Sequence, residues 1–300
     1  MRRLLPTIFL VFERFSAAFL MLFLGSFLAA AAQSPYPSPQ DLVRRAVANE
    51  LKPDEAKFMF QSRKQTPHGS QTRLYVQTED ATAGMLIAVN DQPLDPQQRQ
   101  AEEGHLDYLV RNPAELKRKR KQEKEDSDRI TRILRAMPDA FVFEEDGREQ
   151  GRSGVGTPGE LLVRLKFRPN PQYDPPSRVE QVLTGMKGYI LVDAGKHRIA
   201  KIDGTLYKDV GFGWGILGHL DKGGRFEVEQ GNVGEDGWVT TRMTLNFTGK
   251  VLLFKSLAIN STEIFSQFRK VPNTLSFQDG VALLKQREAK PANGTNNAGG

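Results

Sequence analysis

The stretch from residue 141 to residue 259 constrains the fold most, because apolar and polar side chains alternate through nearly all of it. Period-two alternation is typical of strands with one buried and one solvated face. In the run 161–167, leucine, valine and phenylalanine take every second position around Arg164 and Lys166. Turn signals separate the alternating runs at 145–147, 194–196, 222–224, 235–237 and 248–250. We therefore expect a long antiparallel series of strands, which should curl rather than stay flat.

Two segments outside this series have helical patterns. Ser38 and Pro39 are typical of a helix start, and apolar residues follow at helical spacing from Leu42 to Val47. Residues 94–137 form a charged helical insert whose second half carries an apolar stripe, and we expect Pro138 to end it. Shorter alternating runs between 58 and 89 predict further strands.

The combined pattern predicts an α+β fold, a curled antiparallel sheet or half-barrel whose concave face is covered by helices. We expect one half-barrel domain over 33–285 with the helical insert at about 94–137. The composition of the C-terminal segment predicts a disordered tail over 286–300.

The N-terminus predicts export. Arg2 and Arg3 precede an apolar run, and small residues at Ala29–Ala32 resemble a cleavage site, so residues 1–32 are predicted to be a signal peptide. An uncleaved membrane anchor over Phe15–Ala32 is the alternative. The chain has no cysteine, which excludes disulfides, thiolate metal sites and a lipid-modified cysteine. We expect an exported, periplasmic bacterial protein held together by its apolar core.

The charge pattern does not predict nucleic-acid binding. The net charge of +6 is a mild excess. The basic run 117–121, KRKRK, is followed at once by acids, which predicts a solvated helix face with pairs four residues apart. Contact of this run with anionic lipid headgroups is the alternative interpretation.

Gly154, Gly156 and Gly159 match the spacing G-x-G-x-x-G of dinucleotide sites. That motif requires a strand before it and a helix after it. Here a polar segment precedes it and an alternating strand pattern follows, so we interpret it as a flexible loop between two strands. A second series, Gly211, Gly213 and Gly215, leaves one strand face bare, which fits either a sharp bend or a wall facing a ligand.

Catalytic patterns are absent from the sequence. The four histidines are scattered, and no nucleophile or nucleotide-binding motif occurs. Asp193 and Asp203 flank a hairpin, where carboxylates usually accept turn hydrogen bonds. The proline-rich segment 168–177 fits a rigid connection or, alternatively, a recognition segment. We therefore expect no enzyme, no catalytic or metal-binding residue and no cofactor.

Residues 185–272 resemble the periplasmic lipoprotein-carrier superfamily. The resemblance is carried by GYILVD at Gly188–Asp193 and RIAKID at Arg198–Asp203. The FRKVP ending at 268–272 is also similar to that of a group of uncharacterised exported bacterial proteins. The resemblance implies an incomplete β-barrel with helices on its open side and a cavity for acyl chains. This chain lacks the cysteine that anchors lipoprotein members of the superfamily, and no site residue is carried over.

The strand pattern and the resemblance lead to the same function, an exported carrier or binder of a lipid or other apolar ligand. Burying an acyl chain gains about 0.8 kcal/mol per CH₂, so such a site needs volume rather than reactive groups. The partners we expect are a lipid or acyl chain and, alternatively, a membrane surface or an exported protein. The other function is a structural or interaction module whose concave face is filled by its own helices. The candidate ligand-lining residues are Phe212, Trp214, Ile216, Phe226, Val228, Met243, Leu245 and Phe247.

Overall fold

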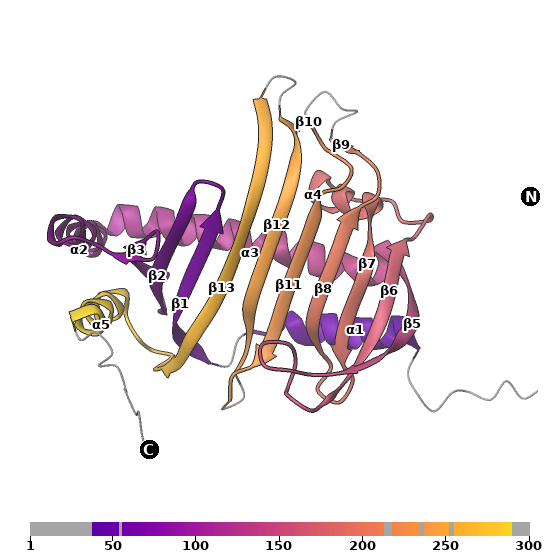
Figure 1. Ribbon diagram of the computed structural model, residues 1–300, viewed down its shortest axis with the longest axis horizontal. Coiled ribbons are helices and arrows are strands. Elements are labelled where there is room, and N and C mark those ends of the chain that lie inside the picture. The colour runs from indigo at the N-terminus through magenta and orange to yellow at the C-terminus, as the bar shows by residue number, and fades with distance from the viewer. Residues whose placement is uncertain (1–37, 54–55, 213–217, 235–236, 252–254, 290–300) are drawn as a thin grey trace, which may run out of the picture. The chain divides into compact units, whose positions relative to one another are not determined.

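A 13-stranded sheet, antiparallel throughout its strand pairs, dominates the computed structural model (Figure 1). The structure describes residues 38–53, 56–212, 218–234, 237–251 and 255–289, all within one compact unit. The strands are β1 (Lys57–Thr66), β2 (Gly69–Gln77), β3 (Thr82–Val89), β4 (Gln92–Pro93), β5 (Phe141–Gln150), β6 (Leu161–Pro169), β7 (Met186–Asp193), β8 (Arg198–Leu206), β9 (Val210–Phe212), β10 (Gly218–Leu220), β11 (Arg225–Asn232), β12 (Trp238–Val251) and β13 (Lys255–Val271). The helices are α1 (Pro39–Glu50), α2 (Pro96–Arg111), α3 (Pro113–Ala140), α4 (Arg178–Gln181) and α5 (Phe277–Ala289), with a 3₁₀ turn η1 (Val182–Gly185).

The strand order is β4-β3-β2-β1-β13-β12-β11-β8-β7-β6-β5, with β9 and β10 attached beside β12. The first and last strands of this order lie at opposite ends, so the sheet does not close into a barrel. This confirms the predicted α+β class, a curled antiparallel sheet with helices packed on it. The proposed signal peptide and its cleavage site lie outside the described residues.

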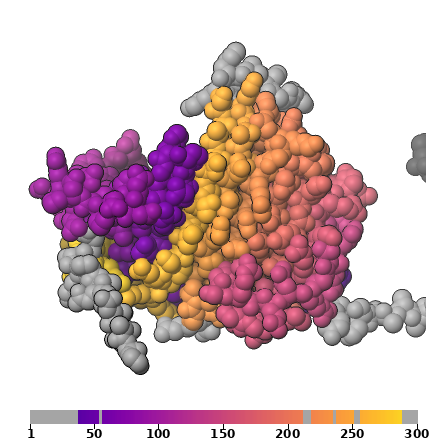
Figure 2. Space-filling model, viewed as in Figure 1, coloured from indigo at the N-terminus to yellow at the C-terminus, as the bar shows by residue number. Residues whose placement is uncertain are grey.

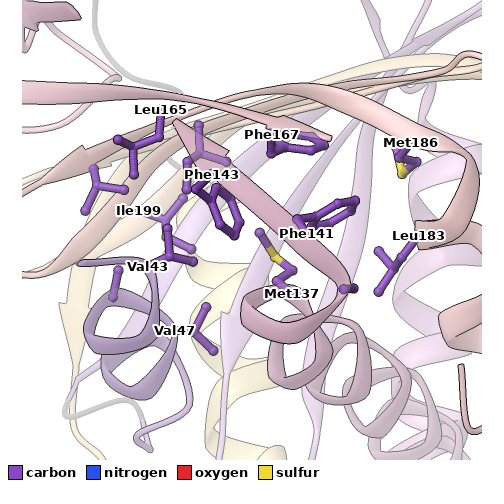
Figure 3. Packing of buried hydrophobic residues seen from close by; sticks show 14 of the residues in the cluster. Val43, Val47, Met137, Phe141, Phe143, Leu165, Phe167, Leu183, Met186 and Ile199 are labelled. Carbon is purple, nitrogen blue, oxygen red and sulfur yellow. The ribbon is translucent and has the colours of Figure 1, made fainter. Parts of the chain in front are cut away.

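The first core lies where α1 and the C-terminal half of α3 cover β5–β8. Buried Val43 and Val47 of α1 meet Met137 of α3 and the strand residues Phe143 and Ile199 (Figure 3). The phenylalanines of β5 and β6 pack on one another, with the rings of Phe141 and Phe167 centred 4.6 Å apart. The apolar stripe expected on the second half of the insert therefore packs into this core. We name the sheet face that α1 covers the α1 face.

The second core lies on the opposite face of the same sheet. Residues that pair directly across antiparallel strands share a face. On β1, Phe60 pairs with Tyr75 on the α1 face, whereas the neighbouring Met59 pairs with Val76 on the other face. Met59 and Val76 belong to the core formed with α2 and α5, so we name that face the α5 face. The alternation led us to expect one covered face, but the structure divides the helices between both.

Helix α3 joins the two covered regions. Its N-terminal half lies beside the turn between β2 and β3, where Glu123 accepts a hydrogen bond from the Thr82 amide at 3.0 Å. The middle of the helix is exposed, and Ile130 is 62% exposed. In Figure 1 the helix runs behind the sheet from α2 towards α1. It packs against α1, α2, α4, η1 and β5.

Three predicted boundaries are wrong. Helix α3 continues through Pro138 to Ala140, because a proline near the end of a helix disturbs few hydrogen bonds and the Gln40 side chain of α1 donates to the Pro138 carbonyl. Strand β5 extends to Gln150, into the segment read as a polar loop. Helix α5 reaches Ala289, four residues into the tail predicted to be disordered.

The loop between β5 and β6 is folded back onto the sheet. Gly154, Gly156 and Gly159 have φ angles of 82°, 71° and 84°, a backbone conformation that favours glycine. Gly156 bridges to Gly231 of β11, and Val155 beside it is 1% exposed. Figure 2 shows this segment over the lower part of the sheet, on the α5 face. Strands on both sides of the glycines exclude a dinucleotide turn, as predicted.

Candidate functional site

An open groove lies on the α1 face between the two helical covers. It has a volume of about 580 Å³ and is bounded by the C-terminal end of α1 and by β1, β11, β12 and β13. The helices cover β5–β8 on this face and β1–β3 on the other, which leaves this part of the α1 face exposed. The lining residues are Asn49, Glu50, Lys52, Pro53, Ala56, Phe58, Phe60, Gln77, Arg198, Gln230, Gly237, Trp238, Val239, Thr240, Met243, Phe265 and Phe268.

Four phenylalanines form the floor of the groove. The Phe60 and Phe268 rings stack with centroids 5.5 Å apart, and Phe265 and Phe58 meet this pair edge-on at 6.1 and 6.2 Å. Tyr75 stacks on Phe60 at 5.4 Å. Such ring pairs hold each other in fixed orientations, so the floor is preorganised.

A β-bulge creates this floor. Phe265 and Phe268 are three positions apart on β13 and would face opposite sides of a regular strand. Gln267 adopts a φ of 56°, and the pairing of β13 with β1 shifts by one residue there. The extra residue returns Phe268 to the α1 face beside Phe265.

A buried ion pair fixes the polar end of the groove. The Glu50 side chain, 8% exposed at the end of α1, has its Oε1 2.9 Å from Nε of Arg198 and accepts from the Ile199 amide at 3.1 Å. Asn49 donates to the Lys196 carbonyl at 3.1 Å. These contacts hold the C-terminal end of α1 on the turn between β7 and β8, so that it forms one wall of the groove.

Trp238 forms the wall next to this ion pair. Its indole Nε1 donates to the Gln230 side-chain oxygen at 2.8 Å and to the Ile199 carbonyl at 3.2 Å. The Arg198 guanidinium lies 5.5 Å from the centre of the indole ring. A cation at this distance is attracted to the face of the ring, which holds the arginine against the groove wall.

Of the predicted ligand-lining residues whose side chains the structure describes, several lie on the α1 face and one, Met243, lines the groove. Met243 lines it, while Val228 and Leu245 share its face through their pairing. Phe226 and Phe247 instead pack against the first core. Trp214, Ile216 and the Phe212 side chain lie outside the described residues.

The sequence missed part of the groove because of a second bulge. In a regular strand Val239 and Thr241 would share a face with Met243, but Gln230 pairs with Thr240 and Glu229 pairs with Arg242. Thr241 therefore faces the α5 face, where its hydroxyl donates to the Gly154 carbonyl at 2.6 Å. Trp238, Val239 and Thr240 line the groove, and Thr241 does not. The phenylalanines at 58 and 60 were visible as a shared strand face, whereas nothing in the sequence predicted that 265 and 268 would join them.

The α5 face of β8 and β11 carries paired charges. The Lys201 ammonium, 10% exposed, donates to Glu229 at 3.0 Å and to Glu227. Burial lowers the pKa of Lys201, but the hydrogen bonds to Glu227 and Glu229 outweigh it and raise the pKa above 10.5. Arg225 pairs with Asp203 at 2.8 Å. These groups satisfy one another, as structural networks do.

The Asp193 carboxylate has the turn role expected of it. It accepts a hydrogen bond from the Lys196 amide at 2.8 Å. The basic run pairs with acids one turn away, for example Lys119 with Glu123 at 2.9 Å, so it forms the solvated helix face that was predicted. Within the described ranges, no group of three or more histidine and acidic side chains could hold a metal ion. In the same part of the chain, no helix is long and apolar enough to cross a membrane.

The sequence matches no family model and no curated protein. Among solved structures, it is similar to the crystal structure of a "putative outer membrane lipoprotein-sorting protein domain" from Vibrio parahaemolyticus. The match has 10% identity and a TM-score of 0.32, and it covers 82% of this chain and 98% of that chain. A likeness of this size assigns no function, so the function proposed below rests on the groove itself.

Proposed function

We propose that this protein binds an apolar or amphiphilic ligand in the groove on the α1 face and acts as its carrier. The observation that supports this is the floor of Phe58, Phe60, Phe265 and Phe268, which none of the helices in the described part of the chain covers. A groove of about 580 Å³ falls within the range of small-molecule sites, roughly 300–1,000 Å³. An acyl chain laid on this floor gains about 0.8 kcal/mol per CH₂ removed from water.

The groove also counts against the alternative of a filled structural module. Such a module would cover this sheet face with its own helices, whereas the middle of α3 remains exposed and the groove stays open. We propose no enzymatic activity, since two of the charged residues that line the groove, Glu50 and Arg198, are engaged with each other in a structural ion pair.

We further propose that the protein works outside the cytoplasm, in a bacterial periplasm. Support comes from the basic and apolar N-terminal segment, which lies outside the described residues. A carrier in an aqueous compartment has to shield an acyl chain from water. The aromatic floor of the groove can bury part of the apolar surface of such a chain.

The test is mass spectrometry of an organic extract from the purified full chain, compared between two variants on neighbouring positions. Phe265→Glu places a charge on the groove floor. Ile264→Glu places the same charge on the opposite face of the same strand, where Ile264 is 43% exposed. Phe265→Leu serves as a milder variant should the glutamate prevent folding.

We expect a bound amphiphile in the wild type and in Ile264→Glu, and its loss in Phe265→Glu. Phe265→Leu should retain it at reduced occupancy. An empty wild-type protein that also fails to bind added lipid would refute the proposal. Loss in Ile264→Glu alone would place the ligand on the α5 face and equally contradict it.

A further inference from the structure

Strands β12 and β13 project beyond the rest of the sheet at the end opposite the groove (Figure 1). Strand β10 lies beside them there through the pairing of Gly218 with Val251. The segments that join these strands, 213–217 and 252–254, lie outside the described residues, and their sequences, GWGIL and LLF, are apolar. We name the described end of β10, β12 and β13 the tip.

The two faces of the sheet differ between the groove and the tip. Met243 lines the groove, and Leu245 and Phe247 follow it on the α1 face of β12. Ile259 of β13 pairs with Phe247 and is 37% exposed. We name these four residues the apolar row, which leads from the groove towards the tip. The intervening positions of β12 face the other side of the sheet and are polar: Thr244, Asn246, Thr248 and Lys250.

Four exposed lysines lie along the end of the sheet that carries the tip: Lys187, Lys208, Lys222 and Lys250. Within the described residues, none of them pairs with a carboxylate. The acids nearest to them in the strand pairing have other partners, since Asp209 accepts the Lys222 amide at 2.7 Å and Asp221 lies 3.1 Å from Nε2 of His219. This end of the sheet therefore carries an excess of free positive charge.

Tyr207 lies between two of these lysines and is 36% exposed. Nζ of Lys187 and Nζ of Lys208 are 5.9 and 5.7 Å from the centre of its ring. Tyrosine rings are common where proteins meet the headgroups of a bilayer, because the ring has an apolar body and a polar end.

We propose that the tip docks on a lipid bilayer that contains anionic lipid, with its lysines among the headgroups and the end of the apolar row at the acyl boundary. A bilayer presents negative charge above an apolar layer, which is complementary to lysines beside exposed apolar side chains. The inference rests on the proposed function for its purpose: a docked tip places the apolar row between the bilayer and the groove, along which an acyl chain can pass.

Co-sedimentation of the full chain with vesicles tests the docking. The vesicles are phosphatidylcholine alone, or phosphatidylcholine with a quarter of phosphatidylglycerol. We expect binding to the anionic vesicles, weaker binding to the neutral ones, and a loss of binding at high salt, which screens exposed charges. Each lysine near an anionic surface contributes about fivefold in affinity, so Lys222→Gln/Lys250→Gln should bind about 25-fold more weakly.

Two matched controls locate the contact. Lys117→Gln/Lys121→Gln removes the same charge from the exposed basic run of α3 and should bind as the wild type does. Ile259→Ser should weaken binding about fivefold, because the exposed part of the isoleucine is available to the bilayer. Ile264→Ser, at a 43% exposed position on the opposite face of the same strand, should not weaken it.

A fluorescent apolar dye added in solution reports on the groove separately. Lys222→Gln/Lys250→Gln should bind the dye normally, and Phe265→Glu should lose the dye and keep vesicle binding. A wild type that binds the dye but not the anionic vesicles would overturn the docking and leave the proposed function standing. A fall in vesicle binding in the α3 variant equal to that in the tip variant would also overturn it. Vesicle binding by a wild type that binds no dye would support the docking and count against the proposed function.

Discussion

Replacing Glu50 by glutamine should destabilise the protein, because Glu50 joins α1 to the sheet at the end of the groove. Its carboxylate is 8% exposed and lies 2.9 Å from Arg198, whose side chain is 25% exposed. Breaking a fully buried pair costs about 3–5 kcal/mol, and an exposed pair contributes about 0.2–1 kcal/mol. Since Arg198 keeps some contact with water, we expect a loss of about 2 kcal/mol.

The substitution isolates the charge. Glutamine retains an oxygen that can accept the Ile199 amide, so the substitution removes the negative charge and keeps that hydrogen bond. A loss of this size should lower the midpoint of thermal unfolding by about 4–8 °C. Circular dichroism during heating and in urea measures both quantities.

A double-mutant cycle with Arg198→Met tests the reasoning. Removing the arginine alone deprives the buried Glu50 carboxylate of this partner, so the double variant should be less destabilised than the two single losses added together. We expect a coupling of at least about 1 kcal/mol between the two positions. A change below about 0.5 kcal/mol in Glu50→Gln, or additive effects in the cycle, would show that this pair does not hold α1 in place.

Three further predictions concern the sheet that carries the groove. Gly188→Ala should lower the free energy of unfolding in urea by about 3 kcal/mol, because the new Cβ would lie 1.9 Å from the Asp203 carbonyl oxygen. An unchanged free energy of unfolding would contradict the close approach of β7 and β8. Gln267→Val should lower the free energy of unfolding by about 1–2 kcal/mol, because a β-branched residue tolerates a φ of 56° poorly, and Gln267→Gly should not lower it. Equal stability of the two variants would argue against the bulge. The difference in free energy of unfolding between the wild type and Lys201→Met should be largest below pH 10.5 and shrink as the pH rises through the raised pKa of Lys201. Urea unfolding at several pH values measures this difference, and a difference that grows with pH would contradict the prediction.

The sequence predicted the character of the sheet well because strand alternation is a local property. Leu165 and Phe167 face the first core and Arg164 faces the other side, as their spacing indicated. Leu42 and Val47 of α1 are buried as their helical spacing required. Each of these assignments depends only on a few neighbouring residues.

The groove could not be predicted in the same way because it depends on bulges and on the placement of helices. The bulges near Thr241 and Gln267 each add one residue, and neither position carries a glycine that would signal it. Which face a helix covers is decided by long-range packing, so the opposite placement of α1 and α5 has no local signal. This is why Met243 was identified and Phe265 and Phe268 were not.

Fluorescence quenching tests the central claim, a groove that shelters an acyl chain, most directly. The chain has two tryptophans, so Trp214→Phe leaves Trp238 on the groove wall as the single reporter. A fatty acid brominated along its chain should quench Trp238 with saturation at one ligand per protein, and Phe265→Glu should abolish the effect. Absence of saturable quenching in the single-tryptophan protein would contradict a ligand in this groove.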